Sequence, residues 1–449
     1  MEKETLYELN PSQEVVKLQC KYTLFKRVIN ILSSATTNKD IDLSLMKKAF
    51  NKVVERNDCL RLNFIKKDGK LMQYFEEKKV FDEIPYIEFK NKEEQDNFFL
   101  ELRKKPIKYM KGIVVEPYFI KTYDKKFMMA LKVCHLILDI YGINIIFKDL
   151  FEVYEALKNN TELPQAPSKF ENVLINDLKN KNNEDTKQKN TEFFTTYLKT
   201  KDNPYYAGIH GINEPIFQKE LAKGRHTSKM FFVKNDTHGF MHEIDKDIVE
   251  KAITYSKENN YSLSSFFFYA LSICASKING GVKNMLPLEL CNCRGTILEK
   301  RCAGTKAQSV ARYTVVDKDK TFEENLSDFC KDQKELYRHL GFSDQEFQML
   351  LHKIYNEPIM NTFYSISFSF IPIQKPKDID IQIYSNGKCA LPAYLGVMWD
   401  VDTNQMNMIY DCYIKTHSEN DIAKFHKKYL NILRQVLENP KIKIVDIKE

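Results

Sequence analysis

The chain has 449 residues, 43% of them hydrophobic, and a formal net charge of +7 at pH 7. This length exceeds what a single hydrophobic core usually serves, so we expect two lobes of an ordinary globular protein. No apolar run approaches the ~20 residues of a membrane-spanning helix, and the polar start "MEKETLYELN" lacks an apolar signal core. We therefore expect a cytoplasmic protein without a membrane span.

Charged residues are numerous and nearly balanced, with 68 lysines and arginines against 61 acidic residues. Their scattered placement favours a solvated surface over a basic face for an acidic partner such as a carrier protein. There is no basic stripe interleaved with aromatic residues, so we expect no nucleic-acid partner. The ten cysteines include no CxxC pair, and Cys291 and Cys293 lack the second pair that a zinc site needs.

Strand and helix patterns alternate through the first third of the chain. Residues 25–34, "FKRVINILSS", and residues 59–65, "CLRLNFI", are typical of strands. Two later strands, "PYFIKTY" and "KFMMALKVC", are expected to form a hairpin that turns at Asp124 and Lys125. Between the first two strands, Asp42 can cap a helix whose apolar face is Leu45, Met46, Ala49, Phe50, Val53 and Val54.

The spacing of apolar residues changes from that of a strand to that of a helix within "KVCHLILDIYGIN", residues 132–144. A strand ends near His135, and we expect Asp139 to bend back beneath the turn that follows. Reactive groups are commonly displayed on loops that rigid elements hold in place. The helical stripe that follows consists of Ile143, Ile146, Phe147, Leu150, Phe151, Tyr154 and Leu157.

The most polar stretch of the chain, residues 176–190, has the composition of an exposed connection. We accordingly predict one lobe over residues 1–175 and a second over residues 191–449. In the second lobe, "SLSSFFFYALSICASKI" predicts a buried helix, and "AQSVARYTVV", "NTFYSISFSFIPI" and "QMNMIYDCYI" predict strands. The last helix is expected to begin at a capping box of Ser418 and Asp421 and to end before Pro440.

The pair His135 and Asp139 is the sharpest candidate for chemistry. Histidine suits general-base catalysis because its pKa lies near neutrality, but the pattern alone fits a structural histidine equally well. His238 and His242 have a spacing that binds metal on a helix, yet Gly239 favours strand or loop, and no third ligand is evident. The sequence contains no G-x-S-x-G elbow and no phosphate-binding P-loop.

Five stretches, taken in order, resemble the condensation domains of nonribosomal peptide synthesis, within the chloramphenicol-acetyltransferase-like acyltransferases. "CHLILDIYGIN" is similar to the family's "HHxxxDGxS": His135 falls on the catalytic His and Asp139 on the Asp, while Cys134 and Ile140 replace the first His and the Gly. "ELNPSQEVV", through Ser12 and Gln13, resembles the first motif. The others are "VVERNDCLRLNF", with Arg56, Leu60, Arg61 and Phe64; "NCRGTILEKRCAGTKAQSV", with Arg294 and Gly304; and the run from Met408 to Ile447.

The resemblance implies an α/β (α+β) fold: a pseudo-dimer of two chloramphenicol-acetyltransferase-like lobes. Each lobe would hold a mixed sheet flanked by helices, and the two would form a V around a central tunnel, with His135 midway along it. A phosphopantetheine-linked acyl donor, on a carrier protein or on CoA, would enter from one side. An amine or alcohol acceptor would enter from the other. We expect no permanently bound cofactor and a monomer.

The resemblance also suggests roles for single residues. His135 would be the general base that deprotonates the acceptor. Asp139 would structure the loop by pairing with an arginine, for which Arg61 is the best match. Gly142 could restore the backbone freedom that Ile140 removes. Ser309 or Ser367 could donate a hydrogen bond to the oxyanion.

Two alternatives to acyl transfer stay open. The replacements at Cys134 and Ile140 are compatible with a catalytically silent module that binds a carrier protein or recruits a partner enzyme. The same base could also hydrolyse a thioester. Retention of both His135 and Asp139 argues against the silent module and leaves hydrolysis open.

Overall fold

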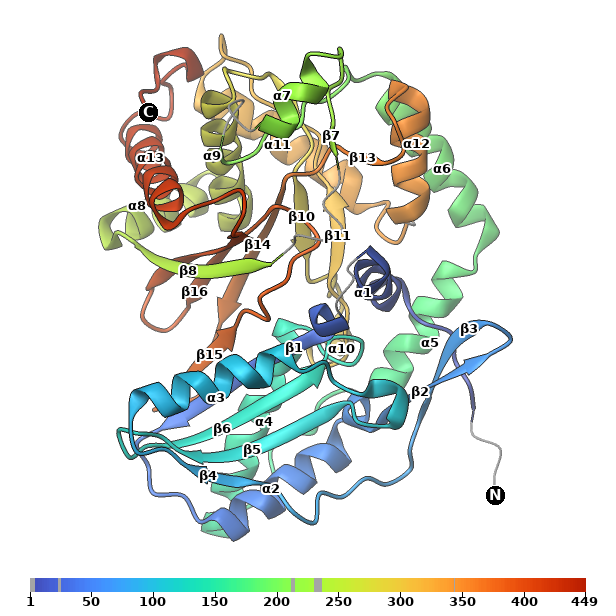
Figure 1. Cartoon of the computed structure of the whole chain (residues 1–449), viewed down its shortest axis with the longest axis vertical. Helices are drawn as coiled ribbons and strands as arrows, with labels where there is room; N and C mark the ends of the chain where they lie inside the picture. Colours follow the sequence, from blue (N-terminus) through green and yellow to red (C-terminus); the bar gives the residue numbers. More distant parts are fainter. Residues whose placement is uncertain (1–4, 23–25, 211–214, 230–235, 343) are drawn as a thin grey trace. The chain divides into compact units, whose positions relative to one another are not determined.

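The computed structural model describes residues 5–22, 26–210, 215–229, 236–342 and 344–449. The chain divides into two compact units (Figure 1). The first consists of residues 1–183, 292–308 and 374–387, and the second of residues 184–291, 309–373 and 388–449. We predicted a connection over residues 176–190. The division falls inside it, but two segments from late in the chain join the first unit.

The first unit is built on a five-stranded mixed sheet of order β15-β1-β6-β5-β4, in which β4 and β5 are parallel and the other neighbours antiparallel. Its strands are β1 (Asn30–Thr37), β4 (Tyr86–Glu88), β5 (Val115–Lys121), β6 (Phe127–Cys134) and β15 (Asp380–Tyr384). A separate hairpin joins β2 (Leu62–Lys67) to β3 (Lys70–Phe75). Its helices are α1 (Pro11–Tyr22), α2 (Leu43–Arg56), α3 (Lys92–Lys104), α4 (Ile140–Asn159), α5 (Phe170–Lys181) and α10 (Ile297–Lys300).

Side-chain alternation along β6 explains why both faces of this sheet are covered. Met129 and Leu131 face a core shared with α2 and α4, whereas Met128 and Ala130 face a smaller core beneath α3. Because successive residues of a strand point to opposite faces, a strand covered on both sides is mostly apolar, and the one charged residue of β6, Lys132, is paired with Glu116 (3.0 Å). All eight residues of β6 are buried.

The second unit contains a six-stranded mixed sheet of order β11-β10-β14-β16-β17-β8. Its strands are β8 (Thr237–Ile244), β10 (Leu288–Cys291), β11 (Gln308–Ala311), β14 (Ile366–Ile373), β16 (Ala393–Asp400) and β17 (Met406–Tyr413). Two short pairs add β7 (Ser228–Lys229) with β13 (Asn361–Thr362) and β9 (Asn284–Met285) with β12 (Thr314–Val315). The helices are α6 (Glu184–Lys199), α7 (Pro215–Leu221), α8 (Lys246–Glu258), α9 (Leu263–Ile278), α11 (Phe322–Tyr337), α12 (Asp344–Tyr355) and α13 (Glu419–Glu438).

Several predicted elements are confirmed. The Asp42 side chain caps α2, Ser418 and Asp421 form the capping box of α13, and α9 is a buried helix. The β5–β6 hairpin turns at Asp124 and Lys125, where Lys125 has a φ of 67°. The mixed sheets flanked by helices agree with the predicted fold class.

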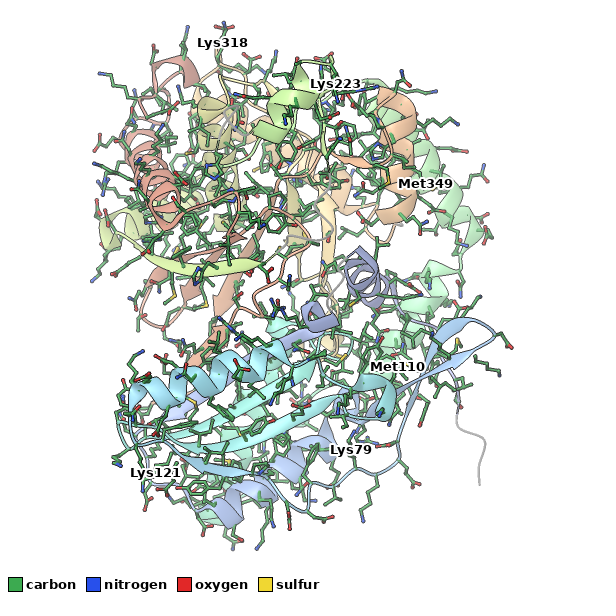
Figure 2. All side chains as sticks on the ribbon, in the orientation of Figure 1. Lys79, Met110, Lys121, Lys223, Lys318 and Met349 are labelled. Atoms are coloured by element: carbon green, nitrogen blue, oxygen red, sulfur yellow. The ribbon has the colours of Figure 1, made fainter. Side chains whose placement is uncertain are left out.

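Other predictions shift by part of an element. In the predicted strand 25–34, residue 25 lies outside the described residues, residues 26–29 form a 3-10 turn, and β1 begins at Asn30. The polar stretch 176–190 is mostly helical, since it contains the end of α5 and the start of α6. Figure 2 shows lysines projecting from both units, as Lys121 does from the first and Lys318 from the second. Within the described ranges, no helix is long and apolar enough to cross a membrane.

Candidate active site

The candidate site is the turn that joins β6 to α4. His135 directly follows β6, and its backbone N–H donates to the Ile29 carbonyl (2.7 Å). Asp139 is the N-cap of α4, and its Oδ1 accepts from the Gly142 N–H (2.8 Å). A carboxylate at this position satisfies an N–H that the first turn of a helix leaves unpaired. The turn is thus fixed at both ends, by strand pairing and by a helix cap.

The ring of His135 has a defined tautomer. Its Nδ1 lies 3.0 Å from the carbonyl oxygen of Leu138, and since a carbonyl only accepts, Nδ1 carries the hydrogen when the ring is neutral. Nε2 then presents a lone pair, and it makes no hydrogen bond to any residue that the structure describes. Burial lowers the pKa of His135 below its ordinary value, while the Asp139 carboxylate partly opposes this shift. The imidazole is therefore held neutral and able to accept a proton at Nε2.

Asp139 is held by a buried arginine from the later segment of the first unit. Arg294 donates from Nη1 to Oδ2 (2.9 Å) and from Nη2 to Oδ1 (3.0 Å), and both side chains are almost fully buried. Oδ2 also accepts from the backbone N–H groups of Lys306 (2.9 Å) and Ala307 (3.0 Å). Burial alone would raise the pKa of Asp139, but the Arg294 guanidinium and these donors hold it below its usual value. The residue is an anchored anion, unsuited to proton transfer.

The prediction that Arg61 pairs with Asp139 is wrong. The Arg61 guanidinium donates to the backbone carbonyls of Val54 (3.3 Å), Glu76 and Glu77 (2.8 Å). It therefore joins the end of α2 to the residues after β3, and its Nε and Nη1 donors are used there. Arg294, which the sequence singled out only as a motif residue, is the partner.

Two glycines allow the segment of residues 292–308 to approach this turn closely. A Cβ on Gly142 would lie 1.8 Å from the Ala303 carbonyl oxygen, and a Cβ on Gly304 would lie 2.0 Å from Cδ2 of Phe170. Gly142 belongs to the first turn of α4, so its role is close packing and not the backbone freedom that we expected. Ile140 occupies the first helical position, a conformation that any L-residue adopts. Its replacement of glycine therefore leaves the turn intact.

The same segment pairs with the turn through its backbone. Leu138 and Gly304 form an isolated antiparallel bridge, and the Thr305 N–H donates to the Ile137 carbonyl (3.2 Å). The Thr305 hydroxyl donates to the His135 carbonyl (2.8 Å), and Gln13 donates to the Leu136 carbonyl (2.8 Å). Consecutive carbonyls of the turn are thus tied to neighbouring elements.

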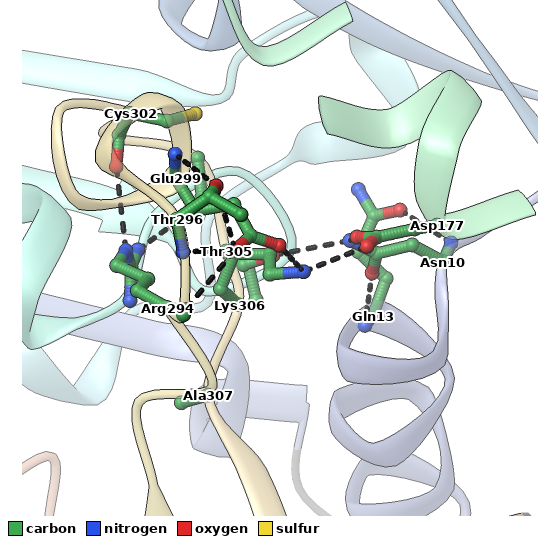
Figure 3. A network of polar contacts seen from close by, with 12 residues as sticks. Asn10, Gln13, Asp177, Arg294, Thr296, Glu299, Cys302, Thr305, Lys306 and Ala307 are labelled. Carbon is green, nitrogen blue, oxygen red and sulfur yellow. Dashed lines mark hydrogen bonds and ion pairs between the residues drawn. The ribbon is translucent and has the colours of Figure 1, made fainter. Parts of the chain in front are cut away.

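A network of charges, in which Lys306 is buried and Asp177 and Glu299 are half-buried, lies along this segment (Figure 3). The Lys306 ammonium sits 2.6 Å from Oδ1 of Asp177 and 3.0 Å from Oε1 of Glu299. Asn10 bridges onward, since its Nδ2 donates to Asp177 (3.0 Å) and to the Thr305 carbonyl (3.2 Å). Burial opposes the charge of Lys306, but the two carboxylates outweigh it and raise its pKa. Despite burial, the Thr296 N–H and the Lys306 ammonium lower the pKa of Glu299 to about 2.

Sequence reasoning missed this network. Asp177 lies in the stretch that we predicted to be an exposed connection, and nothing marked Lys306 as buried or Glu299 as its partner. The sequence signal that pointed toward this region was Gln13. It belongs to the first family motif, and its side chain donates to the Leu136 carbonyl of the turn.

The remaining candidates lie in the second unit. Ser309 is on β11 and Ser367 is buried on β14, so their proposed role toward the oxyanion stays a prediction. His238 and His242 lie on β8, as the strand interpretation predicted. Among the described residues, no three His, Cys, Asp or Glu side chains gather so that they could hold a metal ion.

Cys134, in the first unit, replaces the first histidine of the motif. It is buried at the end of β6. Burial raises the pKa of its thiol, which disfavours a nucleophilic thiolate. The residue therefore packs in the core of the first unit.

A family model described as Condensation domain matches residues 3–448 of the chain. Curated relatives from Bacillus subtilis include one of the plipastatin synthase proteins, 20% identical over 92% of the chain, and surfactin synthase subunit 2, 18% identical over 98%. The chain spans 16% and 12% of the length of these proteins.

Solved structures similar to this fold are also condensation domains. The starter condensation domain of rhizomide synthetase in complex with C8-CoA aligns over 99% of this chain and 98% of its own, with a TM-score of 0.81 and 14% identity. The first condensation domain of the calcium-dependent antibiotic synthetase, in complex with a substrate analogue, aligns over 99% of both chains, with a TM-score of 0.79 and 11% identity.

The family model and the fold agree on the class of protein. The chain belongs to the condensation domain family. Condensation domains of nonribosomal peptide synthetases generally form amide bonds between thioester-bound substrates.

Proposed function

We propose that this chain is an acyltransferase that condenses an amine or a hydroxyl with an acyl thioester, with His135 as general base. The observation that carries the proposal is the state of the His135 ring. Nδ1 is committed to the Leu138 carbonyl, and burial keeps the ring neutral, so Nε2 is the atom that accepts a proton. A base poised in this way contributes about 10²–10⁴-fold to a reaction that includes proton transfer.

The steps balance without a covalent enzyme intermediate. As the acceptor nitrogen or oxygen attacks the thioester carbonyl, its proton passes to Nε2 of His135. The tetrahedral intermediate then collapses, the C–S bond breaks, and the imidazolium returns the proton to the departing thiolate. Holding both reactants in place supplies much of the remaining acceleration.

We assign the donor to the phosphopantetheine thioesters, carried on CoA or on a carrier protein. One rhizomide synthetase condensation domain is described in complex with C8-CoA and Leu-SNAC, a CoA derivative together with a second small substrate. By analogy, this chain takes its acyl donor as a CoA-bound or carrier-bound thioester and an amine or alcohol as acceptor, and it needs no resident cofactor. We place the reaction in the cytoplasm, with the chain acting as a monomer.

The test offers purified protein octanoyl-CoA together with a panel of amines, alcohols and aminoacyl N-acetylcysteamine thioesters. Free thiol and acylated product are both measured for the wild type, for His135→Gln and for His238→Gln, an exposed histidine of β8 that serves as the control. We expect acylated product from the wild type and from His238→Gln, and a loss of about 10²-fold or more in His135→Gln.

Two other results contradict the proposal in different ways. If no pair yields acylated product and thiol release is equal in wild type and His135→Gln, the chain is a silent module. If thiol is released without an acceptor and only when His135 is present, the reaction is hydrolysis.

A further inference from the structure

The segment of residues 292–308, here called the clamp segment, forms one wall of the turn that carries His135. It supplies Arg294 to Asp139, and its backbone bonds to Ile137 and Asp139. It also supplies the hydroxyl of Thr305 to the carbonyl of His135 itself. The position of His135 therefore depends on where this segment sits.

Lys306 fixes the clamp segment to the rest of the first unit. Its backbone N–H donates to Asp139 and its side chain extends to Asp177 on α5, while its second ion-pair partner, Glu299 on α10, belongs to the clamp segment itself. A single residue thus joins the site's aspartate by its backbone and the flanking helix by its charge. The side chain is 5% exposed, so solvent screens these ion pairs weakly.

The charges of this cluster make the ammonium difficult to replace. Two carboxylates, Asp177 and Glu299, both face the Lys306 ammonium, and each raises the pKa of Lys306. Without the cation, two like charges would face each other in a partly buried place and would drive the clamp segment away from α5. The backbone donors that Lys306 and Ala307 direct at Asp139 would move with it.

From this geometry we propose that Lys306 is a positioning residue for His135, acting through the clamp segment and never touching substrate. The inference rests on the proposed function, since it states how the base is held for acyl transfer. The inference goes beyond the proposed function because the Asp177–Lys306–Glu299 cluster lies outside the HxxxD turn. As a consequence, removing the charge displaces the turn while the fold of the unit persists.

The experiment compares Lys306→Met with Arg56→Met in the full chain. Arg56 forms a buried ion pair with Asp149 (2.9 Å), and its described bonds go to Asp149 and the Pro164 carbonyl, away from the turn and the clamp segment. Both variants therefore lose a cation of a largely buried ion pair in the first unit, but only one loses it from the clamp segment. Urea unfolding of both variants gives the stability against which the other measurements are compared.

Amide hydrogen exchange is the first readout, and it requires no turnover. We expect peptides covering residues 136–143 and 303–308 to exchange at least about tenfold faster in Lys306→Met. In Arg56→Met, exchange in these peptides should follow global stability alone. If Lys306→Met leaves the turn protected, or if Arg56→Met of equal stability opens it as much, the positioning role is overturned.

Kinetics are the second readout. For Lys306→Met we expect kcat to fall by about 10–100-fold, with KM changed by less than about twofold, because the base is misplaced while the substrates still bind. A looser turn is better hydrated, which relieves the burial of His135, so the acidic limb of the kcat/KM profile should move to higher pH. Loss of folded protein would lower kcat without moving that limb, and that result would contradict the inference.

The outcomes separate this inference from the proposed function. If the wild type transfers no acyl group, the function fails, while hydrogen exchange still decides whether Lys306 holds the turn. If Lys306→Met does not yield folded protein, Asp177→Asn removes the shorter ion pair and keeps the one with Glu299. For Asp177→Asn we then expect amide exchange in the same peptides to be about threefold faster and kcat to be about threefold lower. Unchanged exchange in Asp177→Asn would overturn the inference.

Discussion

Asp139 and Arg294, separated by 155 residues in sequence, form a two-armed ion pair of 2.9 and 3.0 Å in which neither side chain reaches solvent appreciably. Such a pair is stabilising only while both charges are present, because a lone buried charge keeps its full desolvation cost. The pair ties the start of α4 to the clamp segment, and its geometry matches the flat fork of a guanidinium to a carboxylate.

Replacement of Asp139 by Ala should therefore destabilise the fold as well as the site. We expect the free energy of unfolding, measured by urea denaturation followed by circular dichroism, to fall by about 3–5 kcal/mol. Arg434→Ala provides the control, since Arg434 pairs with Asp245 on the surface of the second unit. Its loss should cost at most about 1 kcal/mol. A fully stable but inactive Asp139→Ala would show instead that Asp139 acts directly in the chemistry.

The pH dependence of activity should reflect the lowered pKa of His135. The neutral imidazole is the active form, and burial favours it, so activity should persist below the ordinary histidine pKa of about 6.5. We expect kcat/KM to be flat from about pH 8 to about pH 6.5 and to fall only in more acidic solution. An acidic limb centred above about pH 7 would mean that the ring is more easily protonated than its surroundings indicate.

Gly142 should not tolerate even a methyl group. In Gly142→Ala the added Cβ would overlap the Ala303 carbonyl, which is backbone of the clamp segment and cannot rotate away. We expect a loss of about 1–3 kcal/mol in the free energy of unfolding, together with reduced kcat. Gly295→Ala, in the clamp segment that faces Gly142, is the control, because its Cβ would lie 3.8 Å from Glu299, an ordinary contact. Equal effects of the two changes would contradict the packing explanation.

Acid should weaken the second unit through His426. Nδ1 of this buried ring lies 2.8 Å from the Tyr410 hydroxyl and Nε2 lies 3.1 Å from the Glu243 carbonyl. Burial lowers the pKa of His426 to about 4. The unfolded chain therefore binds a proton below about pH 6.5 that the folded chain refuses, so stability falls as the pH drops toward 4.

From about pH 7 to about pH 5 we expect His426 to remove about 2 kcal/mol from the free energy of unfolding. His426→Gln should be less stable at neutral pH but should lose less on acidification, as urea denaturation at the two pH values would show. Exposed His238→Gln is the control. If His426→Gln keeps the full pH slope, another group is responsible.

Local signals in the sequence predicted much of the fold. The helix caps at Asp42 and Ser418 and the turn at Lys125 depend on residues next to each other in the chain, and the structure forms all three. The turn that carries His135 and Asp139 was also predicted locally, because the apolar spacing changes there from that of a strand to that of a helix. These interactions close within a few residues, so their pattern survives any tertiary arrangement.

Interactions across long sequence separations were not predicted. Arg61 and Arg294 both belong to motifs, and the choice between them for Asp139 depends on how the chain returns to α4, which no local pattern encodes. Likewise a polar stretch is normally exposed, but α5 holds the half-buried Asp177 against Lys306. Charged side chains in such networks are placed by their partners, not by their neighbours in sequence.

The membership of β15 and the clamp segment in the first unit has a consequence for how the protein is made. β15, residues 380–384, pairs with β1 along the edge of the five-stranded sheet. When only the residues before the clamp segment have been synthesised, α4 and its Asp139 are present without Arg294. At the same stage β1 lacks β15, its neighbour at the edge of the sheet. During synthesis this half-made unit carries an uncompensated carboxylate and an open strand edge, so the N-terminal unit, although translated first, completes its fold only after most of the second has emerged.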